Sequence, residues 1–345
     1  MINFNKIKKK LICAEIGLSH HGSIKKTKKI IDKISLTGAD IIKFQTHIAE
    51  HESTYDEKFR KGFNFKSKTR YDYWKKSEFT KSQWLQIKKY CTKKNLIFLS
   101  SPFSVEAVKL LSSIGQRMWK IGSGEFFSND LNAYIYKKKN PIIISTGMSS
   151  ILEINLKIKE LKKNNVKNFI ILQCTSKYPV PLEEVGINVI KELSKKYNCP
   201  VGLSDHSGTI YPSLLAISDD ITKLIEVHIS EETNLRNPDR KASINFEDLK
   251  LLCTYRDKVE ILKKNKVNKN KIAKDLLNIR QLFTKSIAPK YNLKKGTLLT
   301  KNNLTFKKPG NGIQIHNLKK VLGKKTIKNI SKHFLLKWSD IEKHN

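Results

Sequence analysis

The stretch LIFLSSPFSVEAVKLLSSIGQRMWKIGSG (96–124) decides the fold, because it holds one complete strand–helix–strand unit. Its two ends, LIFLSSPF and MWKIGSG, are short apolar runs next to Ser, Pro and Gly, which is typical of buried strands. The segment between them has the apolar spacing of an amphipathic helix and begins at Ser104, a residue type that caps helices. The pattern predicts two parallel strands joined by a helical crossover.

The alternation of strand and helix continues through the first 230 residues. Helices are also expected after the hydroxyl residues Ser23 and Thr80. Eight runs are expected to form strands: LICAEIG (11–17), DIIKFQT (40–46), LIFLSSPF (96–103), MWKIGSG (118–124), PIIISTG (141–147), FIILQCT (169–175), VGLSDH (201–206) and LIEVHI (224–229). Eight repeats predict an α/β fold, a (β/α)8 TIM barrel, with an open doubly wound sheet as the structural alternative.

The composition and the predicted elements of the sequence change in its last quarter. Helical patterns run from 246 to 281, interrupted by a basic, Asn-rich joint, KKNKVNKNK (263–271). Beyond residue 284 the chain is rich in Gly, Pro and short β-like pieces. We therefore expect a catalytic barrel over 1–262, a linker over 263–283 and a small β-rich domain over 284–345.

The formal net charge of +36 could indicate a polyanion-binding protein. Only seven of the 67 basic residues are Arg, however, and Arg is the residue that contacts phosphates and base edges in bidentate fashion. The surplus is interpreted as a solvated lysine surface, and no nucleic-acid partner is expected. A hydrophobic content of 39% excludes wholesale disorder.

The five cysteines are scattered without paired spacing, so neither a disulfide framework nor a cysteine zinc site is predicted. No apolar run approaches 18 residues, which predicts no membrane span. The N-terminal apolar stretch is broken at Glu15, unlike a signal peptide. We expect a cytoplasmic protein without a membrane partner.

Polar or small side chains stand near the end of nearly every predicted strand. In a barrel these ends converge on one mouth, where catalytic groups lie. Two of them are histidines at consecutive strand ends, His206 and His228. A single strand histidine is more often a satisfied core residue, but two at neighbouring ends can bind a divalent metal ion and leave room for substrate.

Lys43 and Lys120 lie inside otherwise apolar strands, where an unpaired ammonium is costly to bury. Their partners are expected to be Glu15 and Glu125, or the phosphate and carboxylate of a substrate. Hydroxyl groups that could line the same anion pocket belong to Ser101, Ser123, Ser145, Ser176 and Ser204. Alternatively, one of the lysines could form a Schiff base, as in barrel aldolases.

Other catalytic motifs are weak or missing. HIAEH (47–51) matches the H-x-x-E-H pattern of some zinc proteases, but it leaves a strand directly, whereas that chemistry needs both histidines on one helix face. Neither G-x-x-x-x-G-K-[ST] nor G-x-G-x-x-G occurs, so nucleotide-binding loops are not predicted.

A series of ordered motifs runs along nearly the whole chain: AEIGLSHHGS (14–23), KFQTH (43–47), SSPFS (100–104), KIGSGE (120–125), STGMSS (145–150), QCTSKYPVP (173–181), GLSDHSG (202–208), EVHIS (226–230), NPDRKAS (237–243), KKPGNG (307–312) and LGKK (322–325). Together these motifs resemble one family, the sialic acid synthases, which also include legionaminic and pseudaminic acid synthases and condense phosphoenolpyruvate with an amino sugar.

The resemblance implies a TIM barrel fused to a C-terminal antifreeze-like (SAF) domain, in a domain-swapped homodimer. It implies that His206 and His228 bind a divalent ion, with Mn²⁺ expected, and that Glu15 and Glu125 act near the reacting carbons. Phosphoenolpyruvate is expected at Lys43, Lys120, Ser101, Ser123, Ser145, Ser176 and Ser204, and the sugar at Gln45, Tyr178, Asp239 and Lys308.

Two positions depart from the family pattern. Lys308 stands where the family usually has an Arg that reaches the N-acyl group of the sugar, and a lysine lacks the planar fork of a guanidinium. Asn237 replaces a glycine before Pro238 and Asp239.

The function that the resemblance implies is a nonulosonic acid synthase, a transferase that joins phosphoenolpyruvate to N-acetylmannosamine or a diacetamido hexose. The alternatives are a lysine Schiff-base aldolase or lyase on the same barrel, and a non-catalytic polyanion-binding relative.

Overall fold

The computed structural model describes residues 2–59, 67, 69–231 and 238–343. The chain divides into two compact units, Met1–Lys264 and Asn265–Asn345, which are described separately. Among the described residues, no helix has the length and apolar character needed to cross a membrane.

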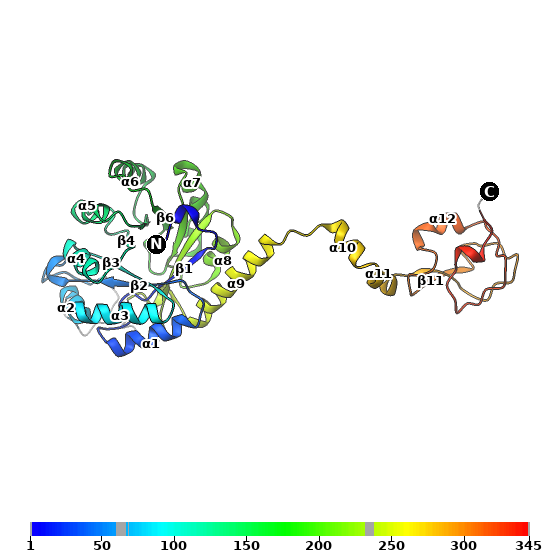
Figure 1. Cartoon of the computed structure of the whole chain (residues 1–345), viewed down its shortest axis with the longest axis horizontal. Coiled ribbons are helices and arrows are strands. Elements are labelled where there is room, and N and C mark those ends of the chain that lie inside the picture. Colours follow the sequence, from blue (N-terminus) through cyan, green and yellow to red (C-terminus); the bar gives the residue numbers. More distant parts are fainter. Residues whose placement is uncertain (1, 60–66, 68, 232–237, 344–345) are drawn as a thin grey trace. The chain divides into compact units, whose positions relative to one another are not determined.

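The barrel of the first unit has eight parallel strands (Figure 1). Seven lie inside runs that the sequence predicts to be strands, and the eighth begins two residues before its predicted run, at Thr222. They are β1 (Leu11–Glu15), β2 (Ile41–Thr46), β3 (Ile97–Pro102), β4 (Trp119–Ile121), β5 (Ile142–Ser145), β6 (Phe169–Cys174), β7 (Val201–Asp205) and β8 (Thr222–Ile229). Neighbouring strands pair in the order β3-β2-β1-β8-β7-β6-β5-β4. This parallel order confirms the barrel and excludes the open doubly wound sheet.

The side chain of Gln116 joins the two ends of this order. Its amide nitrogen donates to the carbonyl of Ser100 on β3, and its amide oxygen accepts from the Ser100 N–H, both at 2.9 Å. Gln116 lies three residues before β4. Its side chain therefore links β3 to the segment that leads into β4, where other neighbouring strands are joined by backbone hydrogen bonds.

Helices follow the strands as expected. They are α1 (Ile24–Ser35), α2 (Arg70–Ser77), α3 (Lys81–Lys93), α4 (Val105–Ser113), α5 (Asn129–Lys137), α6 (Ile151–Lys163), α7 (Ile187–Tyr197), α8 (Tyr211–Ser218) and α9 (Phe246–Lys264). The hydroxyls of Ser23, Thr80 and Ser104 accept from the first turns of α1, α3 and α4, which confirms the predicted caps. Helix α2 is an addition between β2 and α3 that the sequence pattern does not predict.

The period-2 geometry of the strands separates the barrel interior into a lower core and an upper site. Ile41, Leu99, Met118, Ile143 and Leu224 form an apolar layer with Phe4 from the N-terminal segment. Two residues further along the same strands, the inward positions hold the polar residues Lys43, Ser101, Lys120, Ser145 and Glu226. The apolar layer therefore lies below the polar site, which is at the carboxyl ends of the strands.

The second unit begins with α10 (Lys269–Asp275) and α11 (Leu277–Phe283), so the predicted linker is largely helical. Strand β10 (Ser286–Pro289) then pairs antiparallel with β11 (Leu304–Lys307), and α12 (Leu318–Val321) follows. Its core is small and consists of Ile287, Leu293, Leu299, Leu304, Ile313, Val321, Ile330, Leu336 and Ile341.

Candidate active site

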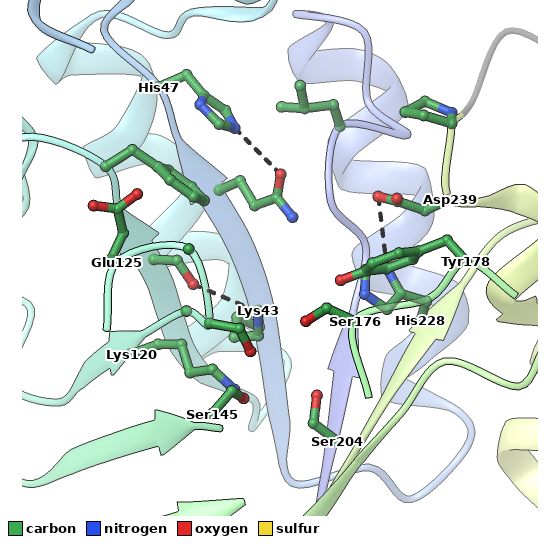
Figure 2. Close-up of a pocket in the computed structure, with 18 of the residues that line it drawn as sticks. Lys43, His47, Lys120, Glu125, Ser145, Ser176, Tyr178, Ser204, His228 and Asp239 are labelled. Atoms are coloured by element: carbon green, nitrogen blue, oxygen red, sulfur yellow. Dashed lines mark hydrogen bonds and ion pairs between the residues drawn. The ribbon is translucent and has the colours of Figure 1, made fainter. Parts of the chain in front are cut away.

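A cavity of about 830 Å³ opens at the carboxyl ends of the barrel strands (Figure 2). The residues that line its inner end belong to the strands: Lys43, Ser101, Lys120, Ser145, Ser204 and Glu226. The residues that line its outer end belong to segments that follow the strands: His47, His51, Glu52, Glu57, Arg70, Trp74, Phe103 and Glu125. Gln45, Ser123, Ser176, Tyr178, His206, His228 and Asp239 line the space between these two ends.

A buried cluster of two lysines and two glutamates occupies the inner end. The ammonium of Lys43 pairs with Glu15 and lies 3.4 Å from Oε1 of Glu226. The ammonium of Lys120 lies 2.8 Å from Oε2 of Glu226. The four side chains are no more than 6% exposed, so each charge depends on the others.

Of the two glutamates expected to partner the lysines, Glu15 is confirmed through its pair with Lys43, but Glu125 is wrong, because Lys120 pairs with Glu226. Glu226 takes that place because β8 and β4 face each other across the barrel, a relation that separation along the chain does not show. Glu125 lies beyond β4, where its carboxylate accepts a hydrogen bond from Ser128. Burial raises the pKa of Glu125 above its ordinary value.

The charges within the cluster determine its protonation. Burial alone would raise the pKa of Glu226, but Lys120 and Lys43 outweigh burial and lower the pKa to about 2. Burial would likewise lower the pKa of Lys43, and Glu15 and Glu226 outweigh it and raise that pKa. At neutral pH, the inner end therefore holds an ionised carboxylate beside an ionised lysine.

Hydroxyl groups surround the lysines. Lys43 donates to Oγ of Ser101 at 3.4 Å, and Ser204 donates to Oε1 of Glu226 at 3.3 Å. Oγ of Ser145 is buried and has no hydrogen-bond partner among the described residues. A buried hydroxyl without a partner is costly, so this atom marks a place where a ligand oxygen would be stabilised.

The loop after β5 passes close to the hydroxyls of Ser123 and Ser176. The N–H of Gly147 donates to Oγ of Ser123 at 3.0 Å. A Cβ atom at Gly147 would lie 2.3 Å from Oγ of Ser176 and 2.9 Å from Oγ of Ser123. Only glycine leaves these two hydroxyls in place beside the cavity.

The two predicted metal-binding histidines come together, with ring centres 5.1 Å apart. Nδ1 of His206 lies 3.1 Å from the carbonyl of Thr175, which assigns the proton to Nδ1 and leaves the Nε2 lone pair available. Burial, assisted by His228, lowers the pKa of His206 to about 3 and keeps the ring neutral. Neutral imidazoles are metal ligands, so the pair fits a divalent ion.

Other groups stand around these histidines. Tyr178 stacks on His206, with ring centres 4.2 Å apart. Nδ1 of His228 lies 3.7 Å from Oδ2 of Asp239 (Figure 2). In the described ranges, no third His, Cys, Asp or Glu joins them in a metal-binding cluster. Any ion held here would therefore take further ligands from water or substrate.

Within the first unit, one predicted site residue, Glu15, does not line the cavity. Glu15 is fully buried, with Oε1 accepting from the Gly17 N–H at 2.6 Å and Oε2 paired with Lys43. Lys308 lies in the second unit, where its ammonium is 5.4 Å from the ring centre of Phe283. Asn237 lies outside the described residues.

His47 lies in the wall of the outer end, although the sequence patterns assign it no role beyond its place in the HIAEH and KFQTH motifs. Its ring stacks between Trp74 and Phe103, at 4.0 Å and 4.2 Å. The segment that follows is a short 3-10 turn, Ala49–His51, so the rejection of a zinc-protease helix is confirmed. The KFQTH motif was the available signal, but no pattern shows that Trp74 and Phe103 flank its histidine.

Comparisons with known proteins agree with this arrangement. Residues 30–268 match the NeuB family model, and residues 284–342 match the SAF domain. The chain is 33% identical to N,N'-diacetyllegionaminic acid synthase of Campylobacter jejuni, over 96% of this chain and 100% of that protein. It is 30% identical to a Campylobacter jejuni pseudaminic acid synthase, over 98% of each chain.

A solved structure gives the same result for the fold. The N-acetylneuraminic acid synthetase of Leptospira borgpetersenii, crystallised with citrate, is 28% identical and superposes with a TM-score of 0.67. The match covers 79% of this chain and 92% of that chain.

Proposed function

The chain belongs to the NeuB family, and we propose that it is a nonulosonic acid synthase, which condenses phosphoenolpyruvate with the open-chain aldehyde of an N-acetylated hexosamine. The products are a sialic-acid-like sugar and inorganic phosphate. The observation that carries the proposal is the inner-end cluster of Lys43, Lys120 and hydroxyls beside the paired imidazoles of His206 and His228. An anionic enol substrate and a carbonyl acceptor need these two sets of groups side by side.

The lysines and hydroxyls bind phosphoenolpyruvate. Lys43 and Lys120 attract its phosphate and carboxylate, and Ser101, Ser123, Ser145, Ser176 and Ser204 supply hydrogen bonds to the same oxygens. Holding the enol in this way places its methylene carbon toward the acceptor, so that attack starts from an oriented pose.

His206 and His228 would hold the divalent ion, and Mn²⁺ is the ion that we propose. When bound, such an ion polarises the aldehyde oxygen as a Lewis acid. Gln45, Tyr178 and Asp239 lie around the same space and bind the hydroxyl and N-acyl groups of the sugar. Their place between the inner and outer ends of the cavity supports this role.

The reaction forms one carbon–carbon bond and one carbon–oxygen bond, to water, and it breaks the carbon–oxygen bond to phosphate. The methylene carbon of phosphoenolpyruvate attacks the aldehyde carbon, and the aldehyde oxygen takes a proton. Water adds to the cationic carbon that results and loses a proton, and the tetrahedral intermediate then expels phosphate. We propose that Glu15 accepts the proton of this water once its pair with Lys43 opens, and that Glu125 at the outer end serves the proton transfers of the acceptor.

The test is phosphate release from phosphoenolpyruvate by metal-stripped protein, with and without added Mn²⁺, across N-acetylmannosamine and diacetamido hexoses. Metal-dependent release with one sugar would establish the reaction and the acceptor together. His206→Ala should lose both Mn²⁺ binding and release, whereas the exposed His333→Ala in the second unit should lose neither. No release with any sugar, from folded protein that binds Mn²⁺, would refute the proposal.

Glu15→Gln separates water activation from metal binding. The variant should lose turnover and keep Mn²⁺ affinity, because the ion's ligands are on β8 and just after β7. Turnover that survives the substitution would show that Glu15 does not activate the water.

The alternative functions give different results. A Schiff-base aldolase would be trapped covalently at Lys43 or Lys120 by borohydride and would release no phosphate. A polyanion-binding protein would bind DNA with strong salt dependence and be indifferent to His206→Ala.

The homodimer, the reach of Lys308 into a partner's cavity and the cytoplasmic location stay predictions. Light scattering would test the dimer, and mixing His206→Ala with Lys308→Ala protein would test the exchange of active-site parts. Recovery of activity in the mixture is expected, because exchange would create one site with both residues intact.

A further inference from the structure

Four planar side chains form a continuous stack in the wall of the outer end. The guanidinium of Arg70 lies 4.9 Å from the ring centre of Trp74. The ring of His47 lies 4.0 Å from Trp74 with 6° between their planes, and Phe103 covers its other face at 4.2 Å and 12°. Because α2, the segment after β2 and the segment after β3 each contribute, the stack fixes the plane of the imidazole within the fold.

Both ring nitrogens of His47 meet neighbouring side chains. Nδ1 faces Oε1 of Glu52, and Nε2 lies 3.2 Å from Oε1 of Gln45 (Figure 2). The side chains of His47 and Glu52 are only 5% and 7% exposed, and Glu52 also accepts from the Ile48 N–H at 3.4 Å. The imidazole is therefore held in its plane by the stack and in its rotation by Glu52.

The contact with His47 determines which atoms Gln45 offers to a ligand. Oε1 of Glu52 and Oε1 of Gln45 both accept, so each ring nitrogen of His47 must carry a hydrogen to hold them. With its oxygen held by the Nε2–H, the Gln45 amide directs its nitrogen toward Gly17, 3.7 Å from where a Cβ on Gly17 would lie. Oδ2 of Asp239 lies 3.1 Å from the same point. The cavity there presents an N–H donor from Gln45 near a carboxylate acceptor from Asp239, which suits a sugar hydroxyl that both donates and accepts.

We propose that His47 is a positioning residue for the acceptor sugar, which fixes the amide of Gln45 with its N–H groups toward the substrate. The inference rests on the proposed function. Phosphoenolpyruvate is an anion and takes the lysines of the inner end, so the neutral sugar occupies the space that Gln45 lines. Without His47 the amide can turn over and present its oxygen instead.

The test is His47→Phe, which keeps an aromatic ring between Trp74 and Phe103 but removes both nitrogens. The KM for the acceptor sugar should rise about tenfold to a hundredfold, because a buried polar contact is lost and the Gln45 amide loses its orientation. The KM for phosphoenolpyruvate should change less than about twofold, since the lysine cluster is untouched. A purely structural role would move both constants together.

A double-mutant cycle with Gln45→Ala tests whether His47 acts on the acceptor sugar through Gln45. Once Gln45 is absent, adding His47→Phe should change the acceptor KM less than about twofold, because the two residues act as one unit. Glu52→Gln is the second variant, and it should raise the acceptor KM in the same direction by a smaller factor, since a neutral amide holds the imidazole less firmly. If His47→Phe does not fold, the cycle is run with Glu52→Gln.

The outcomes distinguish this inference from the function on which it rests. Phosphate release by the wild type, with an unchanged acceptor KM in His47→Phe or with additive effects in the cycle, would overturn the inference alone. No phosphate release by the wild type with any acceptor would overturn the proposed function and the inference with it.

Discussion

The inner and outer ends of the cavity differ in how their charges are arranged. At the inner end, two lysines and two glutamates form one buried cluster, with hydroxyls around it. Among the described residues that line the outer end, three are glutamates, Glu52, Glu57 and Glu125, and one is an arginine, Arg70. The described part of this wall is therefore acidic, although the whole chain has a formal net charge of +36.

The difference in charge between the two ends indicates which substrate each end can bind. The lysines of the inner end suit a phosphate and a carboxylate. At the outer end, Arg70 is already paired with Glu57 at 2.7 Å and stacked on Trp74, so its charge is engaged. That end suits a neutral sugar with hydroxyl and amide groups.

The largest effect is expected from Lys120→Met at the inner end. The change removes a binding group for phosphoenolpyruvate and leaves Glu226 with one lysine fewer, so kcat/KM for phosphoenolpyruvate should fall on the order of a thousandfold. Steady-state phosphate release measures the loss. Lys157→Met is the matched control, because Lys157 is a buried lysine paired with Glu160 at 2.6 Å on α6, outside the cavity. An equal fall in kcat/KM in both variants would show that loss of any buried lysine lowers activity, and would contradict a specific role of Lys120.

A smaller effect is expected when the acceptor carries a phosphate. N-acetylmannosamine 6-phosphate should react about a hundredfold less efficiently than N-acetylmannosamine, because its dianion would face three carboxylates. Glu57→Gln should raise the relative use of the phosphorylated sugar about tenfold by freeing Arg70. Glu247→Gln, exposed on α9, is the control. Equal use of both sugars by the wild type would show that the acidic wall does not select the acceptor.

Ser145→Ala should have an effect of about tenfold on the KM for phosphoenolpyruvate. Its hydroxyl has no partner among the described residues, so its removal should leave the thermal stability unchanged or slightly higher. Ser204→Ala should instead lower stability, since that hydroxyl donates to Glu226. Differential scanning fluorimetry and kinetics on both variants decide the matter, and a destabilised Ser145→Ala would contradict this reading.

The smallest expected effect is on stability in acid. The pKa of Glu226 is about 2 in the folded protein, lowered by Lys120 and Lys43 against the effect of burial, and its ordinary value is 4.5. Its ionised form therefore stabilises the fold fully above about pH 4.5, and this contribution is lost as the pH falls toward 2. The difference in unfolding free energy between wild type and Glu226→Gln, from urea titrations, should shrink over that range. A constant difference would contradict the ionised pair.

Local patterns were enough to predict the eight strands and the first helix caps. The apolar runs have strand length, and Ser23, Thr80 and Ser104 cap their helices through bonds within one turn. The pairing of His206 with His228 was also accessible, because consecutive parallel strands end side by side. Helix α2 was missed because its short, polar segment carries no clear apolar period.

Contacts across the barrel could not be predicted in the same way. Glu226 stood in a recognised strand end, yet its role as the partner of Lys120 depends on two strands, β4 and β8, that are not neighbours. His47 lay in a recognised motif, but its stack needs Trp74 from the added helix and Phe103 from the next strand.

The sequence by itself determined the barrel, the small second unit, the family and the residue types at the strand ends, because strand periodicity, caps and ordered motifs are local properties of the chain. Only the tertiary structure decided which charges neutralise one another and which side chains hold others in place. Those relations depend on distances across the barrel, and closure of the sheet brings together residues more than a hundred positions apart, such as Lys120 and Glu226.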